Sequence, residues 1–188
     1  EEFLAASMTL EISNTDKLAM FAAEAKKSGI TILPPCVNAS EVDFLAEPPK
    51  AGSGTRLSPA GDQGHERLRN RVPAQTARGA IRYSLAALKN IGASAVATIV
   101  ERRQAKGPYK SLGDFAGRLD AKALNKRALE TLSSAGAFDR LEPNRAMVRA
   151  NVEAIMALAN RVASDKAAGT SDLFGGGGGA APVLDLKP

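Results

Sequence analysis

The residues best suited to chemistry in this sequence lie in a short turn, Lys89-Asn90-Ile91-Gly92. Apolar residues recur at helical spacing on both sides of it: Leu85, Leu88, Val96, Ile99 and Val100. Such spacing is typical of two helices that each bury one face. Because Gly92 can take a positive φ at little cost and Asn90 also tolerates the left-handed backbone region, we expect these four residues to reverse the chain, with a left-handed backbone at Gly92. The pattern indicates a helix-hairpin-helix in which Ile91 plugs the groove between the helices.

The chemistry available at this turn is the binding of anions. The N–H groups of Gly92, Ala93 and Ser94 would open the second helix, where backbone donors have no partner within the helix. A helix N-terminus of this kind binds phosphate. The candidate nucleic-acid-binding residues are therefore Lys89, Asn90, Ile91, Gly92, Ala93, Ser94 and, at the far end of the helix, Arg102 and Arg103. The same pattern also fits an ordinary corner between two core helices.

A second copy of the pattern follows 44 residues later. Residues 129–137 align with residues 85–93 so that both leucines, the glycine and the following alanine coincide. The second turn has no lysine and is followed by Phe138-Asp139. Two interpretations stay open: the second copy contacts nucleic acid as well, or it only braces the first.

Positive charge is concentrated around the two turns. Residues 51–150 contain 18 Lys and Arg against 8 Asp and Glu, whereas residues 1–50 contain 4 against 8 and residues 151–188 contain 3 against 4. A basic surplus around candidate phosphate turns indicates a polyanionic partner. With 2 Tyr, 6 Phe and no Trp, the chain has few aromatic rings for stacking on single-stranded bases. We therefore expect contact with the backbone of duplex DNA.

Other kinds of chemistry find little support in the sequence. The one cysteine, Cys36, excludes an intrachain disulfide and fits a reducing cytoplasm, and the one histidine, His65, lies in a polar stretch away from it. No Asp-x-Asp pair occurs in a strand-like context, so we expect no catalytic and no metal-binding residues in the chain. No apolar run reaches transmembrane length and no leader is recognisable, so we expect no membrane contact and a cytoplasmic location.

The helices and strands expected around the turns indicate a mainly helical fold that begins with a small α/β segment. Residues 1–46 are expected to form two short helices, the second capped by Ser13, and then strands at residues 30–33 and 42–46. Residues 80–84 alternate in polarity and are the expected mate of the second strand in a short β-hairpin. Residues 79–142 would then form a tandem helix-hairpin-helix domain, and residues 143–168 one long helix that starts at Pro143.

Two stretches rich in glycine or proline are expected to be disordered, residues 47–78 as an insertion and residues 169–188 as a linker. The insertion carries arginines that could reach nearby DNA, although a solvated loop is the simpler interpretation: Arg56, Arg67, Arg69 and Arg71. The tail contains Thr170-Ser171-Asp172-Leu173-Phe174, whose Leu-Phe pair is a common anchor in peptide recognition.

Several separate stretches resemble the alpha subunit of bacterial DNA polymerase III, in the same order along the chain. They are EFLAASM at residues 2–8, NTDK at 14–17, Gly29-Ile30 to Pro34-Pro35 with Asn38 and Ser40, AIRYSLAALKNIG at 80–92, NKR at 125–127 and AGAFD at 135–139. The NTDK stretch resembles the main replicative form of this family. The resemblance implies a segment that runs from the end of the fingers into a tandem helix-hairpin-helix domain holding duplex DNA.

The resemblance also implies a parent protein that is a DNA-directed DNA polymerase, with magnesium as its cofactor and other holoenzyme subunits as partners. The catalytic carboxylates would lie outside this chain, so the segment itself is expected to be inactive and without a cofactor. Residues 170–174 resemble the clamp-binding peptide of the family, with Thr170 in place of a glutamine. We therefore expect weak binding to the sliding clamp, or a mere linker. The alternative to DNA binding is an α-helical protein-interaction scaffold that makes no direct DNA contact.

Overall fold

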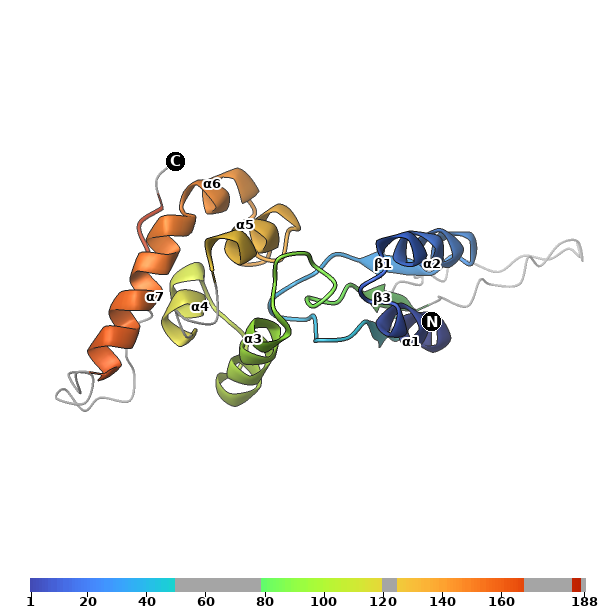
Figure 1. Cartoon of the computed structure of the whole chain (residues 1–188), viewed down its shortest axis with the longest axis horizontal. Helices are drawn as coiled ribbons and strands as arrows, with labels where there is room; N and C mark the ends of the chain where they lie inside the picture. Colours follow the sequence, from blue (N-terminus) through green and yellow to red (C-terminus); the bar gives the residue numbers. More distant parts are fainter. Residues whose placement is uncertain (50–78, 120–124, 168–183, 187–188) are drawn as a thin grey trace, which may run out of the picture.

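The computed structural model describes residues 1–49, 79–119, 125–167 and 184–186. This part of the chain is mainly helical with one small sheet, which confirms the predicted fold class. Figure 1 shows two units side by side, one around α1, α2 and the sheet and one built from α3 to α7. Each unit has an apolar core of its own.

The first unit contains two helices and three strands: α1 (Glu2–Leu10), α2 (Thr15–Lys27), β1 (Thr31–Leu33), β2 (Leu45–Glu47) and β3 (Ala80–Arg82). The strand order is β1-β3-β2, with β3 antiparallel to β2, as the sequence predicts, and also parallel to β1. Ile81 lies opposite Ile32 on one side and Ala46 on the other, and it is fully buried. The sheet therefore ties residues far apart in the sequence into one small core.

The cap of α2 differs from the prediction by one residue. Asn14, not Ser13, has the extended backbone of an N-cap (φ −101°, ψ 94°), and its Oδ1 accepts a hydrogen bond from Lys17 N at 3.1 Å. An N-cap side chain must reach the amide two or three residues ahead, and only residue 14 stands at that distance from the first helical turn.

The second unit contains five helices: α3 (Ala93–Lys106), α4 (Leu112–Arg118), α5 (Lys126–Ser134), α6 (Arg145–Ala150) and α7 (Val152–Ala167). Three aromatic rings form the middle of its core, with Phe115 edge-on to Tyr109 at 5.0 Å and to Phe138 at 4.9 Å between ring centroids. Ser111 and Asn125 cap α4 and α5, as predicted. Leu184 and Leu186, from the predicted linker, pack against this core as partly buried residues.

Two of the predicted helices differ in the structure. Residues 85–90 form turns instead of the first helix of the hairpin, because Ser84 Oγ accepts from the amides of Ala86 and Ala87 at 3.0 and 3.2 Å and so fixes a tight turn directly after β3. The predicted long helix is divided into α6 and α7 at Asn151. The Asn151 side chain donates to Met147 O at 2.8 Å, and such local bonds compete with continued helix.

The start of that region also differs, since α6 begins at Arg145, with Asn144 as its N-cap, and not at Pro143. Asn144 Oδ1 accepts from Met147 N at 3.0 Å. Most of the predicted insertion and linker lies outside the described residues, and the same is true of Arg56, Arg67, Arg69, Arg71 and His65.

Candidate nucleic-acid interface

The first turn, residues 89–92, lies on the surface, and one of its side chains is buried. Lys89, Asn90, Gly92, Ala93 and Ser94 are exposed, whereas the side chain of Ile91 is buried against the helical core. The predicted burial of Ile91 agrees with the structure, although residues 85–90 do not form the first of the two helices between which it was expected to lie. The turn presents one ammonium group and several backbone amides on the same stretch of surface.

The residue that takes the left-handed conformation is Asn90 and not Gly92. Asn90 has φ 65°, and Gly92 has φ −71° and ψ 145°, an extended conformation open to any residue. The predicted positive φ of Gly92 is wrong. Asparagine can take this strain because its short polar side chain tolerates the left-handed region better than most side chains do.

The N-terminus of α3 has no side-chain cap in the described part of the chain. Its N-cap is Gly92, whose carbonyl accepts from Ala95 N and Val96 N at 3.0 and 3.2 Å, and no acidic residue lies in the first turn. Side chains cap four other helices: Asn14, Ser111, Asn125 and Asn144. The exposed amides at the start of α3 therefore form a positive helix end beside Lys89, available to an external anion.

The structure separates the two predicted arginines from each other. Arg102 is exposed, but it lies about 14 Å along α3 from the first residue of the helix at the usual helical rise, and so far from Lys89. Arg103 is only 8% exposed. Its Nη1 donates to Val37 O at 3.0 Å and Ser40 O at 2.7 Å, and its Nη2 pairs with Glu41. Arg103 is thus placed as a structural residue.

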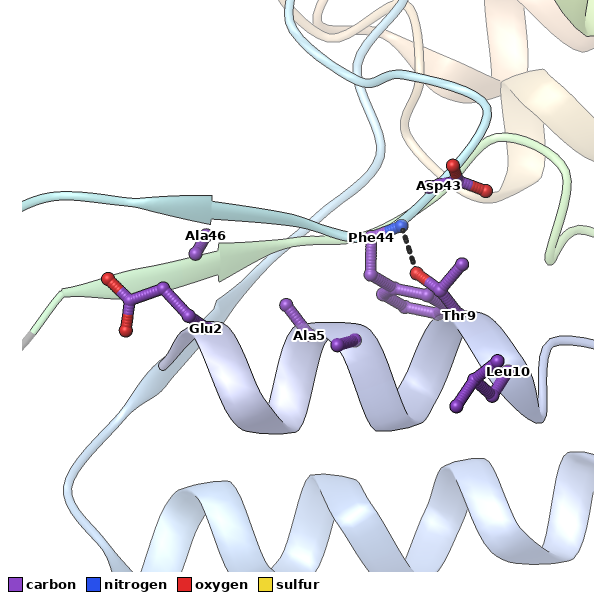
Figure 2. Close-up of a pocket in the computed structure, with 8 residues that line it drawn as sticks. Glu2, Ala5, Thr9, Leu10, Asp43, Phe44 and Ala46 are labelled. Carbon is purple, nitrogen blue, oxygen red and sulfur yellow. Dashed lines mark hydrogen bonds between the residues drawn. The ribbon is translucent and has the colours of Figure 1, made fainter.

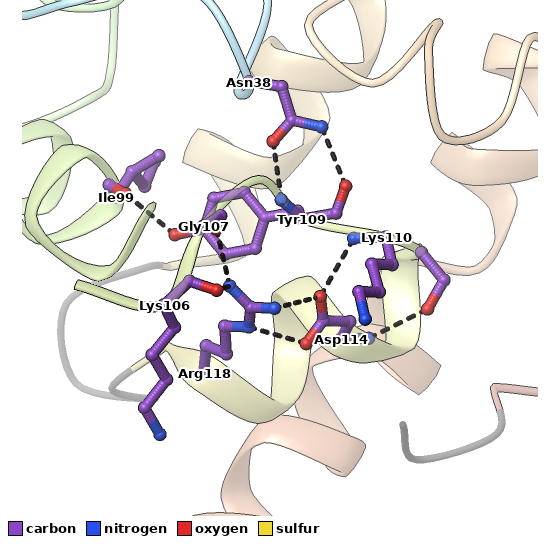
Figure 3. Close-up of polar contacts among 9 residues, drawn as sticks. Asn38, Ile99, Lys106, Gly107, Tyr109, Lys110, Asp114 and Arg118 are labelled. Atoms are coloured by element: carbon purple, nitrogen blue, oxygen red, sulfur yellow. Dashed lines mark hydrogen bonds and ion pairs between the residues drawn. The ribbon is translucent and has the colours of Figure 1, made fainter. Parts of the chain in front are cut away.

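The partners of Arg103 belong to residues 36–41, which we call the strap because this segment crosses from the first unit onto the second. Asn38 and Tyr109 exchange two hydrogen bonds of 2.8 Å, one from Asn38 Nδ2 to Tyr109 O and one from Tyr109 N to Asn38 Oδ1 (Figure 3). Val37 lies in the core of the second unit. Sequence reasoning missed this segment as a positioning element.

A polar network extends from the strap to the connection between α3 and α4. Figure 3 shows Arg118 between the Asp114 carboxylate, which it binds through Nε at 2.6 Å and Nη2 at 2.7 Å, and Gly107 O, at 2.8 Å from Nη1. Tyr109 donates its hydroxyl to Ile99 O at 2.8 Å, and burial raises the pKa of Tyr109 to about 12. These bonds join the strap and the middle of α3 to the residues that connect α3 with α4.

A shallow apolar groove lies apart from the turn, between α1 and β2. Ala5 and Phe44 are buried at its floor, and Thr9 Oγ1 accepts from Phe44 N at 3.1 Å (Figure 2). The carboxylates of Glu2 and Asp43 stand at its edge. Negative charge at the edge makes this groove a poor site for phosphate.

Three further predictions concern the clamp-binding peptide, metal binding and membrane contact. Thr170, Ser171, Asp172, Leu173 and Phe174 lie outside the described residues. Within the described ranges, no three His, Cys, Asp or Glu side chains gather closely enough to hold a metal ion. No helix in the same ranges has both the length and the apolar character needed to cross a membrane.

The sequence of this chain is similar to known proteins over most of its length. A protein-family profile described as a helix-hairpin-helix motif matches residues 29–148. The DNA polymerase III subunit alpha of Caulobacter vibrioides is 36% identical over 179 residues, which is 95% of this chain and 13% of that protein. The subunit of the same name from Vibrio cholerae is 33% identical over 93% of this chain, and that of Saccharopolyspora erythraea 34% over 94%. This chain spans 12% of the length of each of these two relatives.

Proposed function

Because this chain belongs to the helix-hairpin-helix family and is homologous to one segment of DNA polymerase III alpha subunits, we propose that it is the duplex-binding segment of a replicative DNA-directed DNA polymerase. Its role is to hold DNA by the phosphates near the polymerase site. The segment takes no part in phosphoryl transfer, and the catalytic carboxylates lie elsewhere in the longer protein.

The observation that carries this proposal is the open start of α3. An uncapped 14-residue helix begins at the surface, its first turn has no acidic residue, and exposed Lys89 stands directly before it. Backbone amides and a lysine recognise phosphate oxygens without reading base edges. Binding through this turn is therefore independent of DNA sequence.

The proposed parent enzyme uses magnesium, which in such enzymes stabilises the charge that develops on the transferred phosphoryl group. The described residues do not offer a ligand set for this ion. What this chain supplies is the positioning of the duplex by Lys89, the α3 amides and the separate cation of Arg102. The proposed setting is the cytoplasm, in complex with other holoenzyme subunits.

A second proposed contact is the sliding clamp, through residues 170–174. Leu173 and Phe174 supply two apolar anchors, and Thr170 stands where the family's peptide has a glutamine. A short extended peptide with two such anchors can fill an apolar groove on a partner. The missing amide makes this contact weak.

The proposal is tested by titrating a fluorescent duplex with the whole chain and with two single variants. Lys89→Ala should weaken binding severalfold, because it removes a charge that faces phosphate. Lys26→Ala is the matched control, since Lys26 is also exposed but lies on α2 in the other unit, and it should bind as the parent does. Equal binding by Lys89→Ala and the parent would show that the first turn is not the main contact. The absence of duplex binding by the parent would favour the α-helical scaffold that makes no DNA contact.

A further inference from the structure

The two hairpin turns align in sequence but face different surroundings. Gly92 and Ala93 of the first turn are exposed. Their counterparts Gly136 and Ala137 are buried, with Ala137 fully enclosed. The next pair differs most, since Ser94 is exposed and Phe138 lies in the aromatic core. The first turn therefore faces outward and the second faces inward.

The backbone amides of the second turn are used within the protein. Gly136 N donates to Ser133 O at 3.0 Å and Ala137 N to Leu132 O at 2.9 Å. The following helix, α6, begins only at Arg145 and is capped by Asn144. The amides of Gly136 and Ala137, which are the counterparts of Gly92 and Ala93, thus have partners within the protein.

An ion pair covers the second glycine. Arg145 binds the Asp139 carboxylate through Nε at 2.9 Å and Nη2 at 2.6 Å. A methyl group placed on Gly136 would lie 2.6 Å from Arg145 Cζ and 2.8 Å from Asp139 Oδ2, whereas one on Gly92 would meet only Ser94 Oγ at 3.7 Å. The Arg145 guanidinium and the Asp139 carboxylate therefore cover Gly136 together, and they leave no open space there for a phosphate.

The inward-facing turn has a partner within the chain, which is the strap. Ala137 O accepts a hydrogen bond from Val37 N at 3.0 Å, and the Val37 side chain is buried in the same core. Arg103 holds the strap from the side of α3. The strap is thus bound between the helix that follows the first turn and the second turn itself.

We propose that the two hairpins have different partners: the first turn binds duplex phosphate, and the second binds the strap and makes no phosphate contact. The proposal rests on the proposed duplex-binding function and deepens it, because it assigns DNA contact to one hairpin. The second turn is a positioning element that fixes α3, and with it the phosphate-binding amides, relative to the sheet.

The test is a titration of the whole ¹⁵N-labelled chain with a short duplex at low salt, followed by amide resonances. The signals of Gly92, Ala93 and Ser94 should shift, and those of Gly136 and Ala137 should stay in place. Two variants repeat the comparison by affinity. Lys89→Ala and Arg140→Ala each remove one exposed cation, the first from the first turn and the second from the stretch directly after the second turn. Only Lys89→Ala should weaken duplex binding, by severalfold.

The possible failures are distinguishable. Duplex binding with shifts at both turns, or an equal loss of affinity in Arg140→Ala, would overturn the assignment to one hairpin and leave the duplex-binding function standing. An absence of any duplex binding would overturn the function as well. Both substituted residues are exposed, so each variant is expected to fold. The dispersion of its amide spectrum checks this.

Discussion

At the scale of single residues, the two aligned glycines are expected to respond differently to substitution. Gly136 has φ 81° and is covered by the Arg145–Asp139 pair, so Gly136→Ala should destabilise the fold by about 1–3 kcal/mol. Gly92→Ala should cost less than about 1 kcal/mol, because its backbone is extended and space is open around it. Urea unfolding of the two variants measures the difference, and equal losses would contradict the assigned backbone conformations.

The buried hydroxyl of Tyr109 gives a prediction about pH. Burial raises its pKa to about 12, above the value near 10 of an unfolded tyrosine. A raised pKa means that this group stabilises the fold below pH 10 and that its contribution disappears as the pH rises through about 12. The chain has 2 tyrosines, so the absorbance titration of the parent minus that of Tyr109→Phe isolates this group. Ionisation of Tyr109 near pH 10 in the folded chain would contradict its burial.

Thr170 is expected to limit the affinity for the sliding clamp. Burial of Leu173 and Phe174 offers about 3–6 kcal/mol before the peptide is ordered, which leaves weak net binding. Thr170→Gln should tighten the interaction by restoring a long polar side chain. Calorimetry with a purified clamp checks this, and the absence of heat from both forms would identify the segment as a linker.

At the scale of elements, the strap depends on Arg103. Arg103→Met removes the guanidinium that binds Val37 O, Ser40 O and Glu41, and it should lower the free energy of unfolding by about 2–4 kcal/mol. Arg102→Met, one residue away and exposed, is the matched control and should leave stability almost unchanged. If both variants melted at the temperature of the parent, the strap would not hold the two units together.

The sequence predicts local elements better than their partners in space. Helix caps at Ser111 and Asn125 were predictable because they depend on residues three apart. The sequence contains a sign that Arg103 is buried, although its positive charge alone indicates a DNA contact. Arg103 follows Ile99 and Val100 at i+4 and i+3, so it continues the apolar stripe of α3. Its partners lie in the strap more than sixty residues earlier, which no local pattern reveals.

At the scale of the whole molecule, the two units differ in the residues they expose, and the strap connects them. The sheet unit carries the exposed apolar residues Phe3, Leu10 and Met20, and the helical unit carries the open turn. The similarity in sequence left open whether the second hairpin contacts DNA or only braces the first. Their different exposure arises from the residues after each glycine, since a long helix begins at Ala93 whereas the second copy continues into the buried Phe138.

The central claim, that duplex DNA is held through its phosphates at the first turn, is tested most directly by the salt dependence of binding. Two duplexes of unrelated sequence are titrated with the whole chain at about 50 and about 200 mM salt. With two or three phosphates neutralised, we predict equal affinity for both duplexes and a loss of about 10- to 100-fold between the two salt concentrations. Binding that is unchanged by salt, or a strong preference for one duplex, would contradict the claim.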